Sequence, residues 1–211
     1  MPEVLKTFEG KLNTAEHGSM EHQGALLGSI IAHTGLRPGS EKSAKKHEHY
    51  GVSTLRPEHV TVNGDSVNFD FIGKSGKRNT ATIQDASIAK AMAVYLKGKK
   101  EGEPIFQSDR VVKTAGKFMP KGMKLKDMRT IKATQTAAKL LEGVPLPPPL
   151  TGNVSKDKLL LARALKEVSE RVAEILNNTP AIARESYIHP EVIRYWAINK
   201  AGANASLLDE V

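Results

Sequence analysis

The sequence predicts an α+β fold that is mainly α-helical and contains a small, three-stranded antiparallel sheet. Two observations lead to this fold class. Short β-prone runs, separated by turn residues, are confined to residues 51–83. Most of the chain outside this stretch carries apolar residues at the spacing of amphipathic helices.

The first part of the chain predicts little regular structure apart from one helix. Residues 1–24 are polar and are expected to be irregular. From Leu26 the apolar residues follow helical spacing, and this helix should end at Gly35. Residues 40–50 are basic and carry no periodicity, as in a loop or a frayed helix.

The predicted sheet lies in the middle of the chain. Four β-prone runs cover residues 52–55, 60–62, 67–71 and 80–83. Val67, Phe69 and Phe71 alternate with Asn68 and Asp70, which is the pattern of a strand with one buried face. The runs are therefore expected to form the small antiparallel sheet.

The remaining residues predict helices. Their expected positions are 86–96, a short segment near 111–112, 127–141, a long helix from about 155, and a last helix from Pro190 to about 201. The stripe that identifies the long helix consists of Leu161, Leu165, Val168, Val172 and Leu176. Pro145–Pro149 is expected to be a linker, and Asn177–Pro180 should break the helical pattern.

Composition limits the classes of partner and of chemistry. A formal charge of +8 favours a polyanionic partner, nucleic acid first. The absence of cysteine excludes disulfides, thiolate metal sites and cysteine nucleophiles. The sequence shows neither a signal peptide nor an apolar run of ~20 residues. We therefore expect a soluble intracellular protein, located in the cytoplasm, without a membrane partner.

The polar residues favour phosphodiester chemistry without a metal ion. Such a reaction needs cations on the non-bridging oxygens, a nucleophile in line and an acid for the leaving oxygen. The acidic residues are scattered, so arginine and lysine are expected to replace the metal. His47-Glu48-His49 offers only two histidine ligands in a polar segment, and no metal site is predicted there.

Six segments resemble, in order and spacing, the conserved boxes of the type IB DNA topoisomerases. They are Leu36–Lys42, Tyr50–Arg56, Phe71–Gly76, Lys126–Thr130, Leu176–Pro180 and Ser186–Pro190. The resemblance covers about residues 25–195, and the short connection at Pro145–Pro149 is similar to the bacterial and viral branch. It implies the DNA breaking-rejoining enzyme fold, with a catalytic domain over 25–211 after a polar segment over 1–24.

The resemblance also implies roles for single residues. Tyr187 would attack the phosphorus and become a 3′-phosphotyrosine. Arg37 and Arg129 would clamp the non-bridging oxygens, for which the planar, permanently charged guanidinium is suited. Lys74 would act as the general acid on the 5′-oxygen, with Lys77 as the alternative.

Asn178 stands where many members of the family carry histidine. An asparagine amide donates a hydrogen bond to a phosphate oxygen but cannot donate a proton as an acid. Asn178 is therefore expected to bind the transition state. The alternative is that it only caps a helix end.

The implied reaction relaxes supercoiled duplex DNA by transient cleavage and religation of one strand. It needs no cofactor, neither ATP nor a metal ion, and the expected partner is double-stranded DNA bound by a monomer. No counterpart of the family's N-terminal β-rich lobe is recognisable, so DNA binding is expected to be weaker and more sensitive to salt than in a two-lobed relative.

Further basic residues are predicted to position DNA through its phosphates. The candidates are Lys42, Lys45, Lys46, Arg56, Lys77, Arg78, Lys126 and Lys132. Lys126 occupies the place of the histidine in the recombinase His-x-x-Arg box, which favours a topoisomerase. Two alternatives stay open: a tyrosine recombinase or integrase, and a catalytically idle DNA-binding module.

Overall fold

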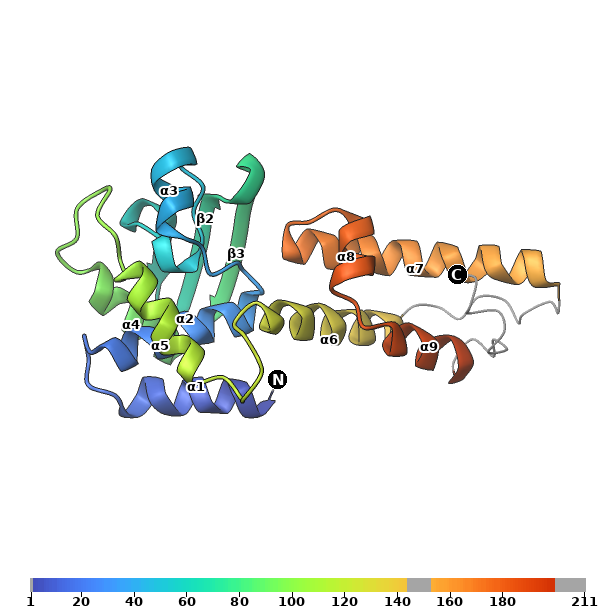
Figure 1. Cartoon of the computed structure of the whole chain (residues 1–211), viewed down its shortest axis with the longest axis horizontal. Coiled ribbons are helices and arrows are strands. Elements are labelled where there is room, and N and C mark those ends of the chain that lie inside the picture. Colours follow the sequence, from blue (N-terminus) through green and yellow to red (C-terminus); the bar gives the residue numbers. More distant parts are fainter. Residues whose placement is uncertain (1, 144–152, 200–211) are drawn as a thin grey trace. The chain divides into compact units, whose positions relative to one another are not determined.

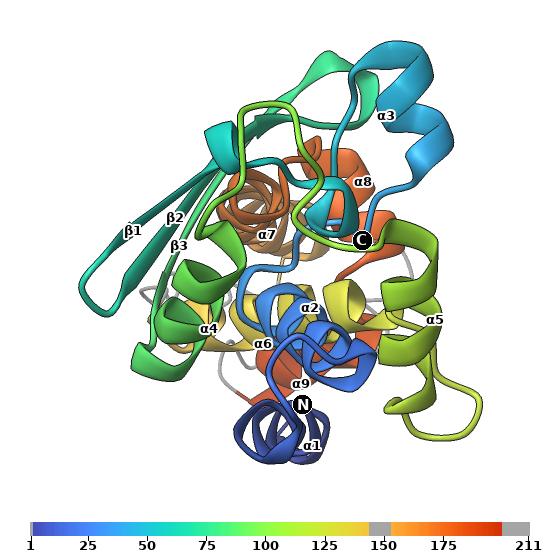
Figure 2. The ribbon, with the colours of Figure 1, turned by 90° about the vertical axis from the view of Figure 1, so that its left-hand side faces the viewer.

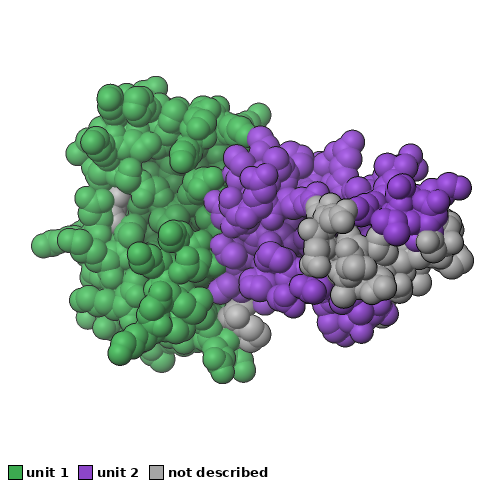
Figure 3. All heavy atoms as spheres, turned by 45° about the vertical axis from the view of Figure 1, so that its right-hand side comes forward, with its two compact units in different colours: residues 1–129 green, residues 130–211 purple. Residues whose placement is uncertain are grey.

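The chain folds into two compact units, Met1–Arg129 (unit 1) and Thr130–Val211 (unit 2), coloured in Figure 3. The computed structural model describes residues 2–143 and 153–199. Each unit has a hydrophobic core of its own.

Helix α2 (Met20–Thr34) is the central helix of unit 1. The Ser19 hydroxyl caps it by accepting the His22 N–H at 3.1 Å, and Gly35 ends it in the left-handed conformation, at φ 70°. Nearly all of its residues from His22 onward are buried, because helices and the sheet surround it. This confirms the helix predicted from Leu26 to Gly35.

Helix α1 (Pro2–Thr14) forms where irregular structure was predicted, so that prediction is wrong. Its one stripe of large apolar residues is Val4, Phe8 and Leu12, all buried. The Phe8 ring occupies the space beside Gly28 of α2, where a side chain would collide with it. The two helices run side by side (Figure 1). A single apolar residue per turn is a weak sequence signal, and α1 is stabilised mainly by packing on α2.

The sheet has the predicted three antiparallel strands. They are β1 (Val60–Asn63), β2 (Ser66–Ile72) and β3 (Arg78–Gln84), in the order β1-β2-β3. Val67 and Phe69 are buried, and the sheet contacts α2 and α4 (Figure 2). The turn η3 (Lys74–Gly76) joins β2 to β3.

The first β-prone run, residues 52–55, is not a strand, which corrects the prediction for this segment. Val52–Thr54 forms a 3₁₀ turn, η1, and a second turn, η2 (Pro57–His59), precedes β1. The N–H groups of Val52 and Ser53 donate to the chain just after α2, at 2.9 and 2.7 Å. Local β propensity is overridden here because the backbone has partners outside the sheet.

The other helices of unit 1 agree more closely with the sequence. α3 (Glu41–His47) is a regular helix capped by Ser40, where a loop or frayed helix was predicted. α4 (Ala86–Leu96) has the predicted bounds, and α5 (Ser108–Lys117) includes the short predicted segment. α6 (Asp127–Gly143) begins in unit 1 and continues into unit 2.

Unit 2 consists of most of α6 together with α7 (Val154–Leu176), α8 (Pro180–Ser186) and α9 (Pro190–Asn199). The whole predicted stripe of α7 is buried in the core of this unit, together with Trp196 of α9. The predicted break after Leu176 is confirmed, but it is followed by α8, which was not predicted. This short helix packs on α7.

Residues 144–152 and 200–211 lie outside the described part of the chain. The predicted linker Pro145–Pro149 and the last two predicted residues of the final helix therefore fall outside it. Within the described ranges, no helix combines the length and the apolar character that crossing a membrane requires.

Candidate active site

The backbone at Arg37 is fixed by the segment that contains η1. The Arg37 carbonyl accepts the Val52 N–H at 2.9 Å, and the next carbonyl accepts the Ser53 N–H at 2.7 Å. Gly39 and Gly51 approach so closely that a Cβ atom on Gly51 would lie 2.5 Å from the Gly39 Cα. The two segments therefore form one tightly packed element that includes the half-buried Arg37.

Lys74 lies at the exposed tip of the β2–β3 hairpin, as predicted. The base of this tip is anchored, because the Tyr50 N–H donates to the Ile72 carbonyl at 2.8 Å. Across the loop, the Gly73 N–H donates to the Lys77 carbonyl at 2.8 Å. The side chain of Lys74 thus projects from a short turn whose stem is held by the residue before Gly51.

Arg129 lies in the first turn of α6 and is 2% exposed. Its Nη1 donates to the carbonyl of Gly35, the residue that ends α2. Its backbone N–H donates to the Lys126 carbonyl at 3.1 Å. The guanidinium is therefore held against the backbone two residues before Arg37.

Three contacts thus link the segments that carry the predicted cations within unit 1. Arg129 binds Gly35, the Arg37 carbonyl binds η1, and the residue before Gly51 binds the base of the Lys74 hairpin. Arginine and lysine are residue types suited to strand cleavage, which demands charge for the non-bridging oxygens and an acid for the leaving oxygen.

Tyr187 belongs to unit 2, where it is the residue that ends α8. Its backbone N–H donates to the Ala183 carbonyl at 3.2 Å. Its carbonyl accepts the Thr134 hydroxyl of α6 at 3.1 Å. The half-buried side chain packs against the core of unit 2, and both backbone polar groups have partners.

Asn178 lies before α8, at the end opposite Tyr187. The left-handed residue that ends α7 is its neighbour Asn177, at φ 50°. The Asn178 backbone N–H also helps to close this helix end, by donating to the Ala173 carbonyl at 2.9 Å. The helix-capping conformation considered for Asn178 therefore belongs to Asn177.

The predicted phosphate-positioning residues differ in exposure and in partners. The exposed ones are Lys42, Lys45, Lys46, Lys77, Arg78 and Lys126, and the half-buried ones are Arg56 and Lys132. Lys45 pairs with Glu41 at 2.9 Å, and the Arg78 Nε donates to Asp70 Oδ1 at 2.7 Å. In a complex with DNA, these two acidic partners would compete with phosphate for their cations.

The two half-buried cations have distinct surroundings. The Arg56 guanidinium lies over the Tyr50 ring, 4.9 Å from its centroid, which stiffens a side chain next to the hairpin base. Burial, with a smaller contribution from the charge of Lys139, lowers the pKa of Lys132. A phosphate near Lys132 would favour its charged form.

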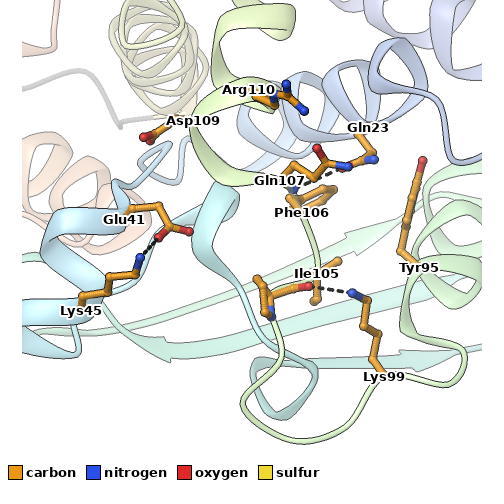
Figure 4. Close-up of a pocket in the computed structure, with 11 residues that line it drawn as sticks. Gln23, Glu41, Lys45, Tyr95, Lys99, Ile105, Phe106, Gln107, Asp109 and Arg110 are labelled. Carbon is orange, nitrogen blue, oxygen red and sulfur yellow. Dashed lines mark hydrogen bonds and ion pairs between the residues drawn. The ribbon is translucent and has the colours of Figure 1, made fainter.

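A pocket of about 600 Å³ in unit 1 is separate from the predicted catalytic residues (Figure 4). None of the five predicted catalytic residues lines it. Its walls combine Glu41 and Asp109 with Lys45 and Arg110, and Lys99 donates to the Pro104 carbonyl at 3.0 Å. This mixture of charges does not form a uniformly basic surface for phosphate.

The structure also places the histidines considered for a metal. The rings of His47 and His49 are stacked, with centroids 5.6 Å apart. Among the described residues, no three histidine or carboxylate side chains gather where they could hold a metal ion.

Sequence reasoning missed Thr134. Its hydroxyl donates to the Tyr187 carbonyl and accepts the His189 N–H, both at 3.1 Å. A threonine within a helical pattern carries no signal of such contacts, because they depend on how α6 packs against the segment between α8 and α9.

Comparison with known proteins agrees with the resemblance of the sequence boxes. The sequence model of the family described as eukaryotic DNA topoisomerase I, catalytic core, matches residues 2–205. The DNA topoisomerase 1B of Acanthamoeba polyphaga mimivirus is 25% identical in an alignment of length 180 that covers 78% of this chain and 52% of the viral protein. The DNA topoisomerase 1 of Mycosarcoma maydis is 30% identical in an alignment of length 169 that covers 66% of this chain and 16% of the fungal protein.

The chain thus spans about half the length of its viral relative and about a sixth of its fungal relative. Among solved structures, a XerH site-specific recombinase bound to its difH substrate is similar, with a TM-score of 0.49 and 13% identity. That match covers 95% of this chain and 51% of the recombinase. Because the family model matches nearly the whole sequence, the chain belongs to the family of the DNA topoisomerase I catalytic core, the type IB topoisomerases.

Proposed function

We propose that this chain relaxes supercoiled duplex DNA by reversible transesterification of one strand. The observation that carries the proposal is the set of contacts linking the segments of Arg37, Lys74 and Arg129 within unit 1. Arginines and lysines without a shared role would not need their segments to be linked by such a series of hydrogen bonds. Family membership adds the chemistry that these residues are suited to perform.

The cations of unit 1 would act on one scissile phosphate. Arg37 and Arg129 would each donate to its non-bridging oxygens, where negative charge grows in the transition state. A guanidinium stays charged at any physiological pH and donates from two nitrogens in one plane. Lys74 would protonate the leaving 5′-oxygen, which is otherwise expelled as a poor alkoxide.

Tyr187 would supply the nucleophile. Its phenolic oxygen would form a bond to phosphorus as the bond from phosphorus to the 5′-oxygen breaks, which leaves a 3′-phosphotyrosine and a free 5′-hydroxyl. A tyrosine phenol ordinarily titrates near ~10, so cations at the phosphate would also favour the loss of its proton to water. Asn178 would add an amide hydrogen bond to a phosphate oxygen.

The same steps in reverse would reseal the strand. The 5′-hydroxyl end would rotate about the intact strand, driven by supercoiling, and would then attack the phosphotyrosine. Because one phosphodiester is exchanged for another, the cycle consumes no ATP. With arginine and lysine as the electrophilic groups, it would not need a divalent cation.

The remaining proposals concern the partner and the extent of the catalytic domain. We propose double-stranded DNA as the partner of a monomer whose catalytic domain includes residues 25–211. The exposed lysines of α3 and of the hairpin tip would contact phosphates on either side of the cleaved bond. Such contacts position the duplex without reading its sequence.

The proposal is tested by relaxation of negatively and positively supercoiled plasmid in EDTA without ATP. We expect the wild-type chain to relax both signs, and Tyr187→Phe to bind the plasmid but leave it supercoiled. Tyr187→Phe removes only the nucleophilic oxygen, so loss of activity with DNA binding intact identifies the nucleophile. If the wild type binds DNA but relaxes neither sign, the proposed function is wrong and the recombinase or idle-module alternative gains support.

A further inference from the structure

The nucleophile segment is held by one side chain of α6 on both sides of Tyr187. The Thr134 hydroxyl donates to the Tyr187 carbonyl at 3.1 Å. The same oxygen accepts the His189 N–H at 3.1 Å. A hydroxyl can serve both partners because it donates one hydrogen bond and accepts others. These two contacts lie within unit 2 and join α6 to the connection between α8 and α9.

The neighbouring contacts leave Tyr187 little backbone freedom. The N–H groups of Tyr187 and Ile188 both donate to the Ala183 carbonyl, at 3.2 and 2.9 Å. The Ile188 side chain is buried in the core of unit 2. The Tyr187 carbonyl, which these helix-end bonds do not hold, is the group that Thr134 binds. Thr134 therefore fixes the peptide plane that follows the tyrosine.

We infer that Thr134 is a positioning residue for the nucleophile. The direction in which a side chain leaves the backbone is set by the dihedral angles at its Cα atom. At Tyr187 these are φ −128° and ψ −33°, outside the ordinary helical range. Rotation about ψ changes the orientation of the Tyr187 side chain relative to its own carbonyl, so it would either break the contact with Thr134 or turn the side chain. The hydroxyl holds this conformation, which helix formation alone does not favour.

The inference rests on the proposed function, because positioning matters only if Tyr187 attacks phosphorus. In-line attack is sensitive to small displacements, and a misplacement of about 1 Å can slow an enzymatic step on the order of 10²-fold. Thr134 lies five residues after Arg129 on α6. The helix that begins with a predicted phosphate clamp thus also carries the residue that holds the nucleophile segment.

The test compares three variants of the full chain. Thr134→Val keeps the branched shape and removes the hydroxyl, whereas Thr134→Ser keeps the hydroxyl. Thr136→Val is the matched control, because residues two apart on a helix point about 200° away from each other. Each variant is assayed for duplex DNA affinity and for the rate of single-turnover formation of the covalent adduct with plasmid, trapped by denaturant.

We expect Thr134→Val to slow adduct formation about 10- to 100-fold while DNA affinity stays close to that of the wild type. Thr134→Ser and Thr136→Val should cleave at nearly the wild-type rate. A merely structural role would not produce this separation of chemistry from binding or the rescue by serine. Amide hydrogen exchange of His189, followed by NMR, should accelerate in Thr134→Val alone, which reports the lost contact independently of activity.

The possible failures are distinguishable. If the wild type forms no adduct, the proposed function is wrong and the positioning role is overturned with it, whatever the His189 amide shows. If the wild type cleaves and Thr134→Val cleaves equally fast, only the positioning role is overturned. If Thr134→Ser is as slow as Thr134→Val, the hydroxyl is not the group that matters, and the inference is again wrong.

Discussion

Two lysines three residues apart, Lys74 and Lys77, stand on the same hairpin tip and are both exposed. Their backbones differ in role. The Lys77 carbonyl closes the loop by accepting from Gly73 and from the side-chain amide of Asn79, each at 2.8 Å. The assignment of Lys74 as the acid comes from the resemblance of the hairpin box.

Substitution at each position separates the two lysines. Lys74→Ala should slow strand cleavage by about 10²- to 10⁴-fold, the usual contribution of a positioned general acid. Lys77→Ala should weaken DNA binding slightly and leave the single-turnover rate at saturating enzyme close to that of the wild type. The measurement is covalent adduct formation under single-turnover conditions. The reverse pattern would assign the acid to Lys77.

At the scale of elements, the close pair Gly39 and Gly51 determines how the Arg37 segment packs. A methyl group on Gly51 would overlap the backbone of Gly39 and the carbonyl of Arg37. We expect Gly51→Ala to reduce the free energy of unfolding by about 1–3 kcal/mol, the range for overpacking a tight interior, and to lower cleavage activity because Arg37 moves. Urea denaturation followed by circular dichroism measures the first effect.

The matched control for this substitution is Gly10→Ala. Gly10 lies within α1, and beyond its chain neighbours and the adjacent backbone of its own helix no atom lies within 4 Å of the Cβ position. Because alanine favours a helix interior over glycine, this variant should gain about 0.5–1 kcal/mol of stability. Equal stability of the two variants would show that the contact between Gly39 and Gly51 is looser than the structure indicates.

The elements that could be predicted from sequence are those with dense local patterns. The five-residue stripe of α7 and the alternation in β2 each repeat often enough to determine both type and position. α1 has one large apolar residue per turn, and α8 spans only Pro180–Ser186, so neither produces a clear period. The run at 52–55 has β propensity, but its hydrogen bonds go to the Arg37 segment.

The residues of the candidate site also differ in whether they could be predicted from sequence. Arg37, Lys74, Arg129 and Tyr187 could be proposed because each lies in a segment resembling a family box. Thr134 could not, because its importance comes from two backbone groups more than fifty residues away in sequence. The acidic partners of Lys45 and Arg78 were also missed. In the case of Arg78, the reason is that Asp70 meets it only through the pairing of β2 with β3.

For the whole molecule, the charge of +8 should dominate DNA affinity. If about six cations neutralise phosphates, the logarithm of the binding constant should fall with the logarithm of salt concentration at a slope of about −5. Affinity for a short duplex should then drop on the order of 10³-fold between about 50 and 200 mM salt. Fluorescence anisotropy measures this, and a nearly flat dependence would contradict it.

Two adjacent lysines of α3 offer a matched pair for the same measurement. Lys45 is paired with Glu41, whereas Lys46, also exposed, belongs to no ion pair that we find among the described residues. Lys46→Ala should therefore reduce the magnitude of the salt slope by about 1, as expected when one phosphate contact is lost. Lys45→Ala should change it less.

The hydrogen bond between Arg129 and Gly35 also bears on the order in which the proposed site would assemble during folding. It joins residues 94 positions apart, so it closes a long loop, and contacts of high sequence separation form late because chain entropy opposes them. Ribosomal synthesis reinforces this order, since Arg129 emerges after every other residue of unit 1. In the proposed mechanism, a nascent chain would therefore bring its predicted phosphate-binding cations together only when unit 1 is complete, and the nucleophile Tyr187 would follow later still.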